Sequence, residues 1–487
     1  MFAKTQIWIY LRASVITLVA VLYTYNIARL TLFPAVPSGD DMIRHISICL
    51  YQDFTSYLSP PQYPNIVHTV CHMIAGQDIL RAVNFFKVFG FVVALLPVLL
   101  LLYELTKIET KYAIPLALAI QLYGIRYLQT VSDGTIFNIF SFAMYILTIQ
   151  LLLRRHFFYA GVTSGLALIH YYGIVYTATL IPSIFFIKAV KQFVPGLIIG
   201  LMPSIHKWLY LALLAFQHGA TIAGVSELPK WTLQNYLSYA FTPDIYWGDA
   251  AFYTYIATAI ILIMNRQFNR LSLLLSITPG MYIVTTLVLP ITVISPSVIT
   301  TTLTFRMYRL LPFVLILLII LLLRTRGYRR YDGLITLLLT SALLVGATTN
   351  LTAVPQGSHR IDHNAFNALL SLKPEICEGG VIATGGTAEY IEIICRDVVV
   401  LNPPSLLATI SLKDPKAVLI RQILAQVENG TLQGYSWFVL QEPIAGQWYH
   451  PEIKSFVQRL KEKIFVFGEV KYIIYNQGVP VYIIRLR

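Results

Sequence analysis

Three groups of charged residues in this sequence have the types and spacing that catalysis or anion binding requires. Asp40 and Asp41 are adjacent and follow the first apolar segment by a few residues. Asp133 stands directly before another apolar run, and Arg306 and Arg309 are three residues apart, so they would share one face of a helix. Carboxylates can act as a general base or hold a metal ion, and paired guanidiniums bind phosphate through forked hydrogen bonds.

Each of these groups also has a purely structural interpretation. Asp40 could cap the helix that starts directly after it, because Gly-Asp before an apolar run is a good helix start. Asp133 could cap the next apolar helix in the same way. Arg306 and Arg309 could reach lipid headgroups from the end of a span. A functional role for the acids therefore depends on whether the fold brings them to one surface.

The elements that must position these residues are predicted to be membrane-spanning helices. The chain has 487 residues, of which 56% are hydrophobic and 12% charged, whereas ordinary globular proteins carry roughly 25% charged residues. The apolar residues fall in long runs, close to the ~20 residues that a helix needs to cross a bilayer. We therefore predict a polytopic α-helical membrane protein. This composition argues against a soluble enzyme and excludes a disordered chain or a small disulfide scaffold.

The formal net charge of +13 fits a membrane protein better than a nucleic-acid-binding protein. Neither a basic stripe with interleaved aromatic residues nor a zinc-finger pattern accompanies the charge in the sequence. Cationic loops that face an anionic cytoplasmic leaflet explain it directly. We therefore expect membrane lipids, and no nucleic acid, among the partners.

Eleven spans are predicted, and the basic residues orient them. Pairs of Lys and Arg recur in alternate loops, and four arginines lie in the last of these loops. Because basic loops stay on the cytoplasmic side, the N-terminus is predicted to be cytoplasmic, and an odd number of spans leaves the tail outside. The predicted spans lie near 13–33, 83–104, 112–128, 135–153, 157–173, 174–188, 193–215, 250–264, 271–290, 307–323 and 333–349.

Two domains follow from this topology. Residues 1–349 form the transmembrane domain, whose long first outer loop, 34–80, is expected to carry one or two surface helices. Residues 350–487 form an extracytoplasmic α/β domain with a mostly parallel sheet, because strands and helices alternate there. The expected helices are 364–372, 388–395, 416–426 and 451–463, and the expected strands are 380–384, 398–401, 437–441, 464–475 and 481–486.

All four cysteines fall outside in this topology, where disulfides persist. Cys49 and Cys71 lie in the first outer loop, and Cys377 and Cys395 lie in the tail. Four cysteines allow three pairings. The local pairs Cys49–Cys71 and Cys377–Cys395 are favoured, and four unrelated buried thiols are the alternative.

Several histidines and one lysine have two interpretations each. His68 and His72 are four residues apart, which resembles half of a metal site, although interfacial packing explains them better. His170 lies near the outer end of a predicted span and could face a sugar or be satisfied within the bundle. His206 and Lys207 fall inside the predicted span 193–215, so either the span is broken there or both side chains face a cavity.

The order of these motifs resembles that of the C-type glycosyltransferase superfamily (GT-C), which includes the protein mannosyltransferases and the lipid A aminoarabinose transferase. The acidic pair follows the first span, and a second acid, Asp133, opens the fourth span. Between them stand Pro60-Pro61-Gln62-Tyr63 and a lead from Gly76 to Arg81 and Ala82 into the second span. Two departures matter: the family has Asp-Glu or a single acid where this chain has two aspartates, and the tail lacks the Trp-Trp-Asp of oligosaccharyltransferases.

The resemblance implies an inverting enzyme that moves a sugar from a polyprenyl (dolichyl-type) phosphate to a lipid, glycan or protein acceptor. Asp40 or Asp41 would be the general base, Asp133 would orient a substrate, and Arg306 and Arg309 would bind the lipid phosphate. A divalent ion such as Mg²⁺ or Mn²⁺ is compatible with these acids and not required by the sequence. The further residues expected near substrate are Arg44, Tyr63, Arg81 and His170.

Other functions compete with this one. A lipid-linked polysaccharide polymerase or ligase also uses arginines at the outer face, but its long loops come late in the chain, whereas here the long loop comes first. A transporter would show two related halves and charges near the bilayer midplane. A non-catalytic, partner-binding membrane subunit is the third alternative. In each case a multi-pass protein of the cell membrane is expected.

Overall fold

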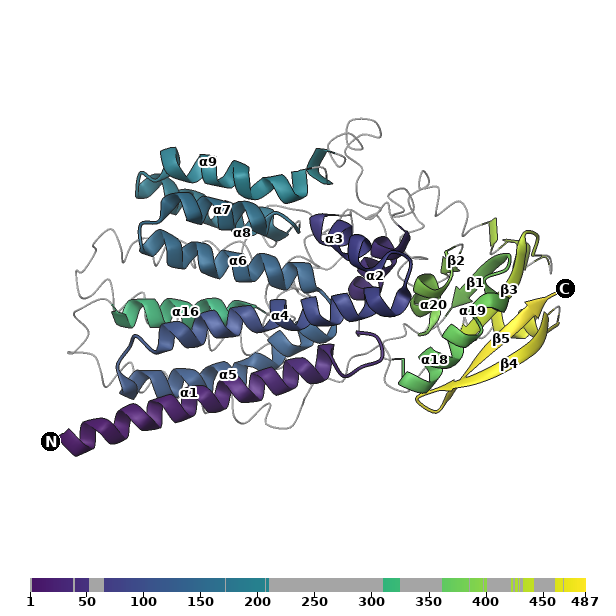
Figure 1. Cartoon of the computed structure of the whole chain (residues 1–487), viewed down its shortest axis with the longest axis horizontal. Helices are drawn as coiled ribbons and strands as arrows, with labels where there is room; N and C mark the ends of the chain where they lie inside the picture. Colours follow the sequence, from purple (N-terminus) through teal and green to yellow (C-terminus); the bar gives the residue numbers. More distant parts are fainter. Residues whose placement is uncertain are drawn as a thin grey trace, which may run out of the picture.

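The computed structural model separates the chain into a helical bundle and a small α/β domain at its C-terminal end (Figure 1). The described residues are 2–37, 40–51, 65–170, 172–205, 207–209, 310–324, 361–384, 386–396, 398–400, 432–441, 460–466 and 468–487, with a few positions between 422 and 429. The predicted spans at 250–264, 271–290 and 333–349 lie outside them, as do Tyr63, His206, Arg306 and Arg309.

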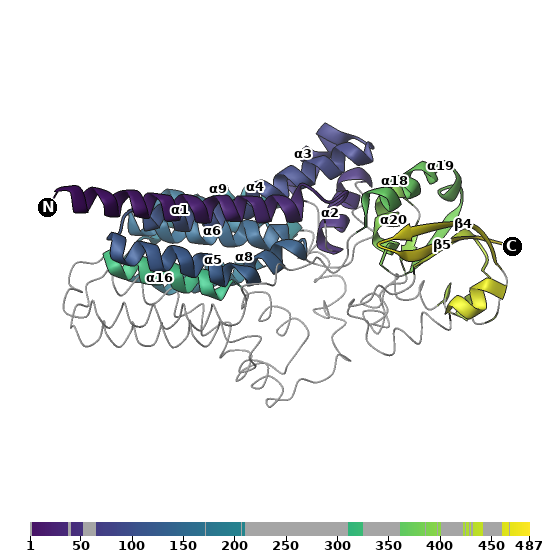
Figure 2. The same ribbon diagram turned by 90° about the horizontal axis from the view of Figure 1, so that it is seen from below.

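The bundle is built from long helices that lie side by side (Figures 1 and 2). Their bounds agree with the predicted spans to within a few residues, except that the first helix begins near the N-terminus and α9 is shorter than its predicted span. These helices are α1 (Phe2–Thr31), α4 (Ile79–Leu105), α5 (Thr110–Ser132), α6 (Ile136–Leu153), α7 (Phe157–Ala167), α8 (Tyr172–Phe186), α9 (Val190–Leu201) and α16 (Leu311–Arg324).

Three of the described helices are long and apolar enough to cross a membrane. They cover Gln6–Thr31, Ile79–Leu105 and Ile136–Leu153. Shorter apolar helices include Phe157–Ala167 and Tyr172–Phe186. Lipid offers no partner for backbone groups, so spanning segments must satisfy their hydrogen bonds internally, as helices do. By their length and composition, these helices indicate a membrane protein.

Helices α7 and α9 pack backbone against backbone through glycines. A Cβ atom added to Gly161 would lie 2.1 Å from the carbonyl oxygen of Phe193, and one added to Gly200 would lie 2.1 Å from that of Val162. Gly165, on the same face of α7, is as crowded. Small residues four apart let membrane helices approach in this way. Neither helix could carry a larger side chain at these positions without moving.

The segment after α1 forms the short helices α2 (Asp40–Tyr51) and α3 (Ile66–Ala75), as predicted for the loop 34–80. Both lie between the bundle and the C-terminal domain (Figure 1). We call the end of the bundle on which they lie the domain-facing end. A disulfide between Cys49 and Cys71 joins the two helices, with their Cα atoms 5.8 Å apart.

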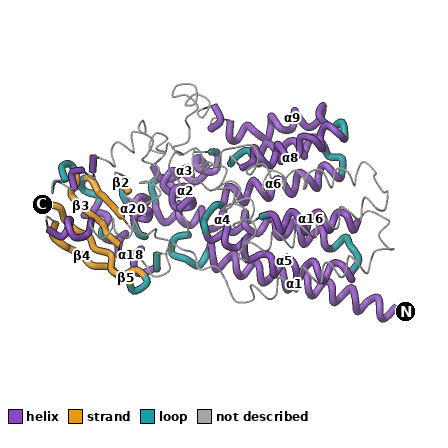
Figure 3. Tube along the Cα trace, turned by 180° about the vertical axis from the view of Figure 1, so that it is seen from behind, coloured by secondary structure: helices purple, strands orange, loops and turns teal. Residues whose placement is uncertain are grey.

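The C-terminal domain carries a five-stranded sheet in the order β2-β1-β3-β5-β4. Figure 3 shows the strands gathered at the end of the molecule opposite the N-terminus. The strands are β1 (Gly380–Thr384), β2 (Val398–Val400), β3 (Tyr435–Gln441), β4 (Gly468–Asn476) and β5 (Val479–Leu486), and the helices are α18 (His363–Ser371), α19 (Lys373–Ile376) and α20 (Ala388–Ile394).

The prediction of a mostly parallel sheet is wrong. Strand β1 pairs in parallel with β2 and β3, but β5 pairs antiparallel with β3 and β4. The reason is the two-residue turn between β4 and β5, where Gln477 and Gly478 both have positive φ angles of 52° and 78°. Such a turn forms a tight hairpin, which makes its strands antiparallel. Residues 460–466 are helical, so β4 also begins four residues later than predicted.

Both predicted local disulfides are confirmed. Besides Cys49–Cys71, a bond joins Cys377 to Cys395, whose Cα atoms are 5.3 Å apart. The alternative of four separate thiols is therefore wrong. Because such bonds persist in oxidising compartments, they fit an extracytoplasmic C-terminal domain.

Candidate functional site

The two predicted acidic segments belong to helices that meet at the domain-facing end of the bundle. The meeting point is Gly90 in α4, which has no side chain of its own. A Cβ atom placed there would lie 2.9 Å from Ile136 Cδ1, 3.3 Å from Met42 Cε and 3.8 Å from Thr31 Cγ2. The start of α2, the start of α6 and the end of α1 therefore converge on one turn of α4.

Asp40 and Asp41 form the first turn of α2, because the helix begins at Asp40. The partial positive charge of a helix N-terminus favours carboxylates at this position. Met42, which reaches the meeting point at Gly90, follows them directly. The acidic pair is thus anchored to the bundle through its own helix.

Asp133 stands at the same end, in the turn between α5 and α6. It follows the last residue of α5, and its side chain is half-buried. The residue in the N-cap position of α6 is Thr135, not Asp133. Asp133 is instead the C-cap residue of α5. Ile136, which contacts the Gly90 position, lies three residues further on.

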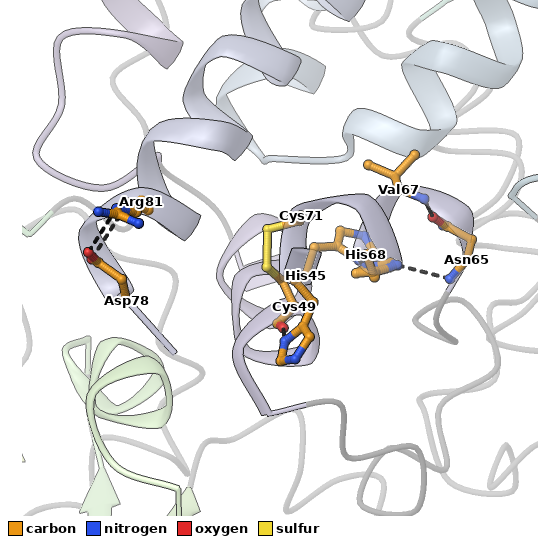
Figure 4. Close-up of a disulfide and its surroundings, with 9 residues drawn as sticks. His45, Cys49, Asn65, Val67, His68, Cys71, Asp78 and Arg81 are labelled. Atoms are coloured by element: carbon orange, nitrogen blue, oxygen red, sulfur yellow. Dashed lines mark hydrogen bonds and ion pairs between the residues drawn. A yellow bond between two sulfur atoms is a disulfide. The ribbon is translucent and has the colours of Figure 1, made fainter. Parts of the chain in front are cut away.

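A buried histidine pair lies beside the start of α2 (Figure 4). Nδ1 of His68 accepts a hydrogen bond from the Asn65 N–H at 3.0 Å, so the hydrogen-bond network assigns the proton of the neutral ring to Nε2. That Nε2 lies 2.9 Å from Nδ1 of His45, to which it donates. By the same rule His45 carries its own proton on Nε2. Hydrogen bonds therefore run in one direction, from the backbone N–H at the start of α3 through His68 to His45 in α2.

Burial keeps His45 neutral. Its ring packs edge-on against Phe137 with centroids 4.4 Å apart and stacks on Phe86 at 6.3 Å. Burial, together with the charges of Lys207 and Arg44, lowers the pKa of His45 to about 3. His45 lies one helical turn after Asp41 and packs on Phe137, one turn after Asp133. It marks the centre of the candidate site.

Lys207 is buried next to this centre. Its side chain is 1% exposed, and its Nζ donates to the carbonyl oxygen of Ile169 at 2.9 Å. It also lies over the ring of Trp208, 5.3 Å from the centroid. A positive charge on Lys207 contributes to lowering the pKa of His45.

The regular α-helix of the predicted span 193–215 is interrupted before Lys207. Helix α9 ends at Leu201 and continues as a 3-10 turn over Met202–Ser204 that contains Pro203. Proline removes a backbone donor and interrupts a regular helix. The span is therefore broken just ahead of the lysine.

His170 is buried near the same end. Its Nδ1 accepts the N–H of Tyr172 at 3.4 Å, and the two rings stack with centroids 5.1 Å apart. The residue before it is Ile169, whose carbonyl binds Lys207. This geometry fits the predicted interpretation of a histidine satisfied within the bundle.

Arg81 and Arg44 have different surroundings. Arg81 is exposed and pairs with Asp78 at 3.3 Å, and Asp78 in turn caps α4 by accepting the backbone N–H of Arg81 (Figure 4). This pair defines the start of a helix. Arg44 is half-buried on α2, four residues after Asp40, and its charge acts on His45. Of the two arginines, Arg44 is the one that shares helix α2 with Asp40 and Asp41.

The predicted phosphate-binding arginines, Arg306 and Arg309, precede the described part of α16. Leu310, the next residue in the sequence, is fully buried. The ring of Phe313 lies 4.8 Å from that of Tyr127, near the end of α5 that leads to Asp133. The first turn of α16 therefore lies in the domain-facing half of the bundle.

The nitrogens of His68 and His72 are engaged in ways that disfavour a metal. Both nitrogens of His68 already form hydrogen bonds, and Nδ1 of His72 lies 2.7 Å from the carbonyl oxygen of Cys49, to which it donates. Within the described ranges, no group of three His, Cys, Asp or Glu side chains gathers as a metal site. These hydrogen bonds fit the packing interpretation of the two histidines.

The role of His45 was missed in the sequence, although a signal for it exists. His45 precedes Cys49 by four residues and His68 precedes Cys71 by three, so each lies about one turn before its cysteine. Once the disulfide aligns α2 with α3, the two rings must come together.

Comparison with known proteins adds no family assignment. A scan against protein-family models finds no match to this chain, and a search of the curated proteins finds no relative. The interpretation of the site therefore depends on its residues and their arrangement.

Proposed function

We propose that this chain is a membrane glycosyltransferase of GT-C architecture. It transfers a sugar from a polyprenyl (dolichyl-type) phosphate to a lipid, glycan or protein acceptor at the outer membrane surface. One observation carries the proposal: two acidic segments far apart in the sequence belong to helices that converge on Gly90. The buried Lys207 lies close enough to His45 on one of these helices to affect its pKa. Carboxylates and a cation at one membrane edge are what this transfer requires.

The acids act on the acceptor. Asp40 or Asp41 takes the proton of an acceptor hydroxyl while that oxygen attacks the anomeric carbon of the sugar. The new C–O bond forms as the bond to phosphate breaks, and the electron pair leaves with the lipid phosphate, which inverts the anomeric centre. Asp133 orients acceptor or sugar, or helps to hold a divalent ion such as Mg²⁺ or Mn²⁺.

Cations act on the leaving group. The phosphate gains negative charge as its bond to the sugar breaks, so a fixed positive charge lowers the barrier. Arg306 and Arg309 are proposed for this role from the sequence. Lys207 in its protonated form is proposed as a third cation, supported by the effect of its charge on His45 at the centre of the site. Arg44 and Tyr63 are proposed to contact the sugar or acceptor.

The same proposal includes the full topology. Eleven spans in residues 1–349 cross the cell membrane, with the N-terminus in the cytoplasm and residues 350–487 outside. The agreement of the described helices with eight predicted spans supports it, as do two disulfides in segments assigned to the outside.

The test is to neutralise each acid. We expect at least one of Asp40→Asn and Asp41→Asn to abolish sugar transfer from a polyprenyl-phosphate donor in proteoliposomes, with the thermal unfolding midpoint unchanged. The matched control is Asp78→Asn, which removes an exposed acid that caps α4 and lies away from the meeting point. Full turnover by both variants would show that neither aspartate is the base.

A further inference from the structure

Helix α2 has almost no face left for solvent. Between Met42 and Leu50 every residue except Arg44 is buried. A helix lying on a surface keeps a polar, exposed stripe, so a helix buried all round must be covered from more than one side. Helices α3 and α4 contact α2 from the bundle, and α20 contacts it from the C-terminal domain. Figure 1 shows α2 between these two sets of elements.

Helix α20 is enclosed in the same way. Six of its seven residues are buried, and Glu392 is the exception. Strands β1, β2 and β3 and helix α18 contact it within its own domain, and α2 contacts it from outside. The buried apolar side chains of the bundle, of α2 and of α20 form one continuous cluster. The contact between the two domains is therefore a packed core.

A hydrogen bond joins the ends of the two helices. Tyr51, the last residue of α2, donates its hydroxyl to the carbonyl oxygen of Ile393 at 2.8 Å. Because α20 ends at Ile394, no backbone N–H within the helix is placed to donate to the Ile393 carbonyl. A buried carbonyl without a donor costs free energy, so this hydroxyl stabilises the end of α20.

Disulfides hold both partners of this bond. Tyr51 is two residues after Cys49, which is bonded to Cys71 on α3. Ile393 is two residues before Cys395, which is bonded to Cys377 after α19. The contact thus connects two segments that are each tied to a second element.

We propose that the C-terminal domain is a positioning element for α2. Helix α20 holds α2 against α3 and α4, and so fixes the first turn of α2, which contains Asp40 and Asp41. The claim that this positioning serves catalysis rests on the proposed function, whereas the claim that α20 holds α2 in place does not. Tyr51 is the positioning residue through which it can be tested.

The mechanical test is hydrogen–deuterium exchange of the full chain in nanodiscs. In Tyr51→Phe, which keeps the ring, we expect the amides of α2 and α20 to exchange about tenfold faster, which corresponds to about 1.4 kcal/mol. Exchange in α4 should stay unchanged. The matched control is Tyr475→Phe, an exposed tyrosine on β4 of the same domain. Unchanged exchange of α2 in Tyr51→Phe overturns the proposal.

The catalytic test measures sugar transfer with the same variants. Positioning predicts that Tyr51→Phe lowers kcat and leaves KM for the donor unchanged, because the donor site is intact while the base is less well placed. Faster exchange with an unchanged kcat overturns the positioning of the acids. If the parent chain transfers no sugar while Tyr51→Phe still exchanges faster, the proposed function is refuted. The mechanical coupling of α2 to the C-terminal domain would then still hold.

Discussion

The histidine pair makes this protein sensitive to acid, in a way that can be calculated. Folded His45 stays neutral down to about pH 3, whereas an unfolded histidine takes up its proton near its ordinary pKa of 6.5. Between these values the unfolded chain binds more protons than the folded one. The free energy of unfolding therefore falls as the pH is lowered through this window. Above the window, the contribution of His45 to stability is retained in full.

The magnitude follows from the two pKa values. One pKa unit corresponds to about 1.36 kcal/mol, so lowering the pH to about 5 should cost about 2 kcal/mol through His45. His45→Phe removes this titration, since phenylalanine can fill the space between Phe86 and Phe137. It also leaves the Nε2–H of His68 without its acceptor, so the variant should be less stable at neutral pH.

The assay is equilibrium unfolding in SDS at neutral pH and near pH 5. The difference between the two free energies should be about 2 kcal/mol smaller in His45→Phe than in the parent. His363→Phe serves as the matched control, because His363 is an exposed histidine on α18 and its loss should leave the difference unchanged. An acid response of equal size in His45→Phe and the parent would refute the assignment of a neutral, buried His45.

Two further substitutions test the bundle and the donor site. Gly165→Ala would put a Cβ 2.4 Å from the carbonyl oxygen of Leu197, so it should lower the free energy of unfolding in SDS by about 1–3 kcal/mol. The control Ile198→Ala, on the exposed side of α9, should not lower it. Equal stability of both variants would contradict the glycine contact. Lys207→Met should raise KM for the polyprenyl-phosphate donor roughly tenfold or more and leave KM for the acceptor unchanged. The reason is that a hydrogen bond to a charged group contributes about 1.5–3 kcal/mol. An equal rise in both KM values would indicate structural damage.

Much of the fold follows from local properties of the sequence. Long apolar runs identify the helices of the bundle, because a backbone in lipid must satisfy its own hydrogen bonds. The strand Gly380–Thr384 and the helix starting at Ala388 were predicted to the residue or nearly so, since their boundaries depend on neighbouring residues. The two disulfides join cysteines that are close in sequence, so their pairing needed little knowledge of the fold.

Contacts between distant segments could not be found in this way. The sheet proved to be mixed because β5 inserts between β3 and β4, a choice made by packing and by the turn at Gln477 and Gly478. His45 has no motif of its own and gains its character from His68 and two phenylalanines on other helices. A side chain's partners across the fold set its protonation state, and one-dimensional patterns do not record them.

Some features of the candidate site could be predicted from the sequence, and others depend on the fold. The sequence was enough to select Asp40, Asp41 and Asp133, because acids beside apolar runs are costly and stand out. Their convergence near Gly90, the burial of Lys207 and the enclosure of α2 by α20 depend on how helices pack. Hydropathy and chemistry select the residues, whereas non-local packing decides which of them share one site.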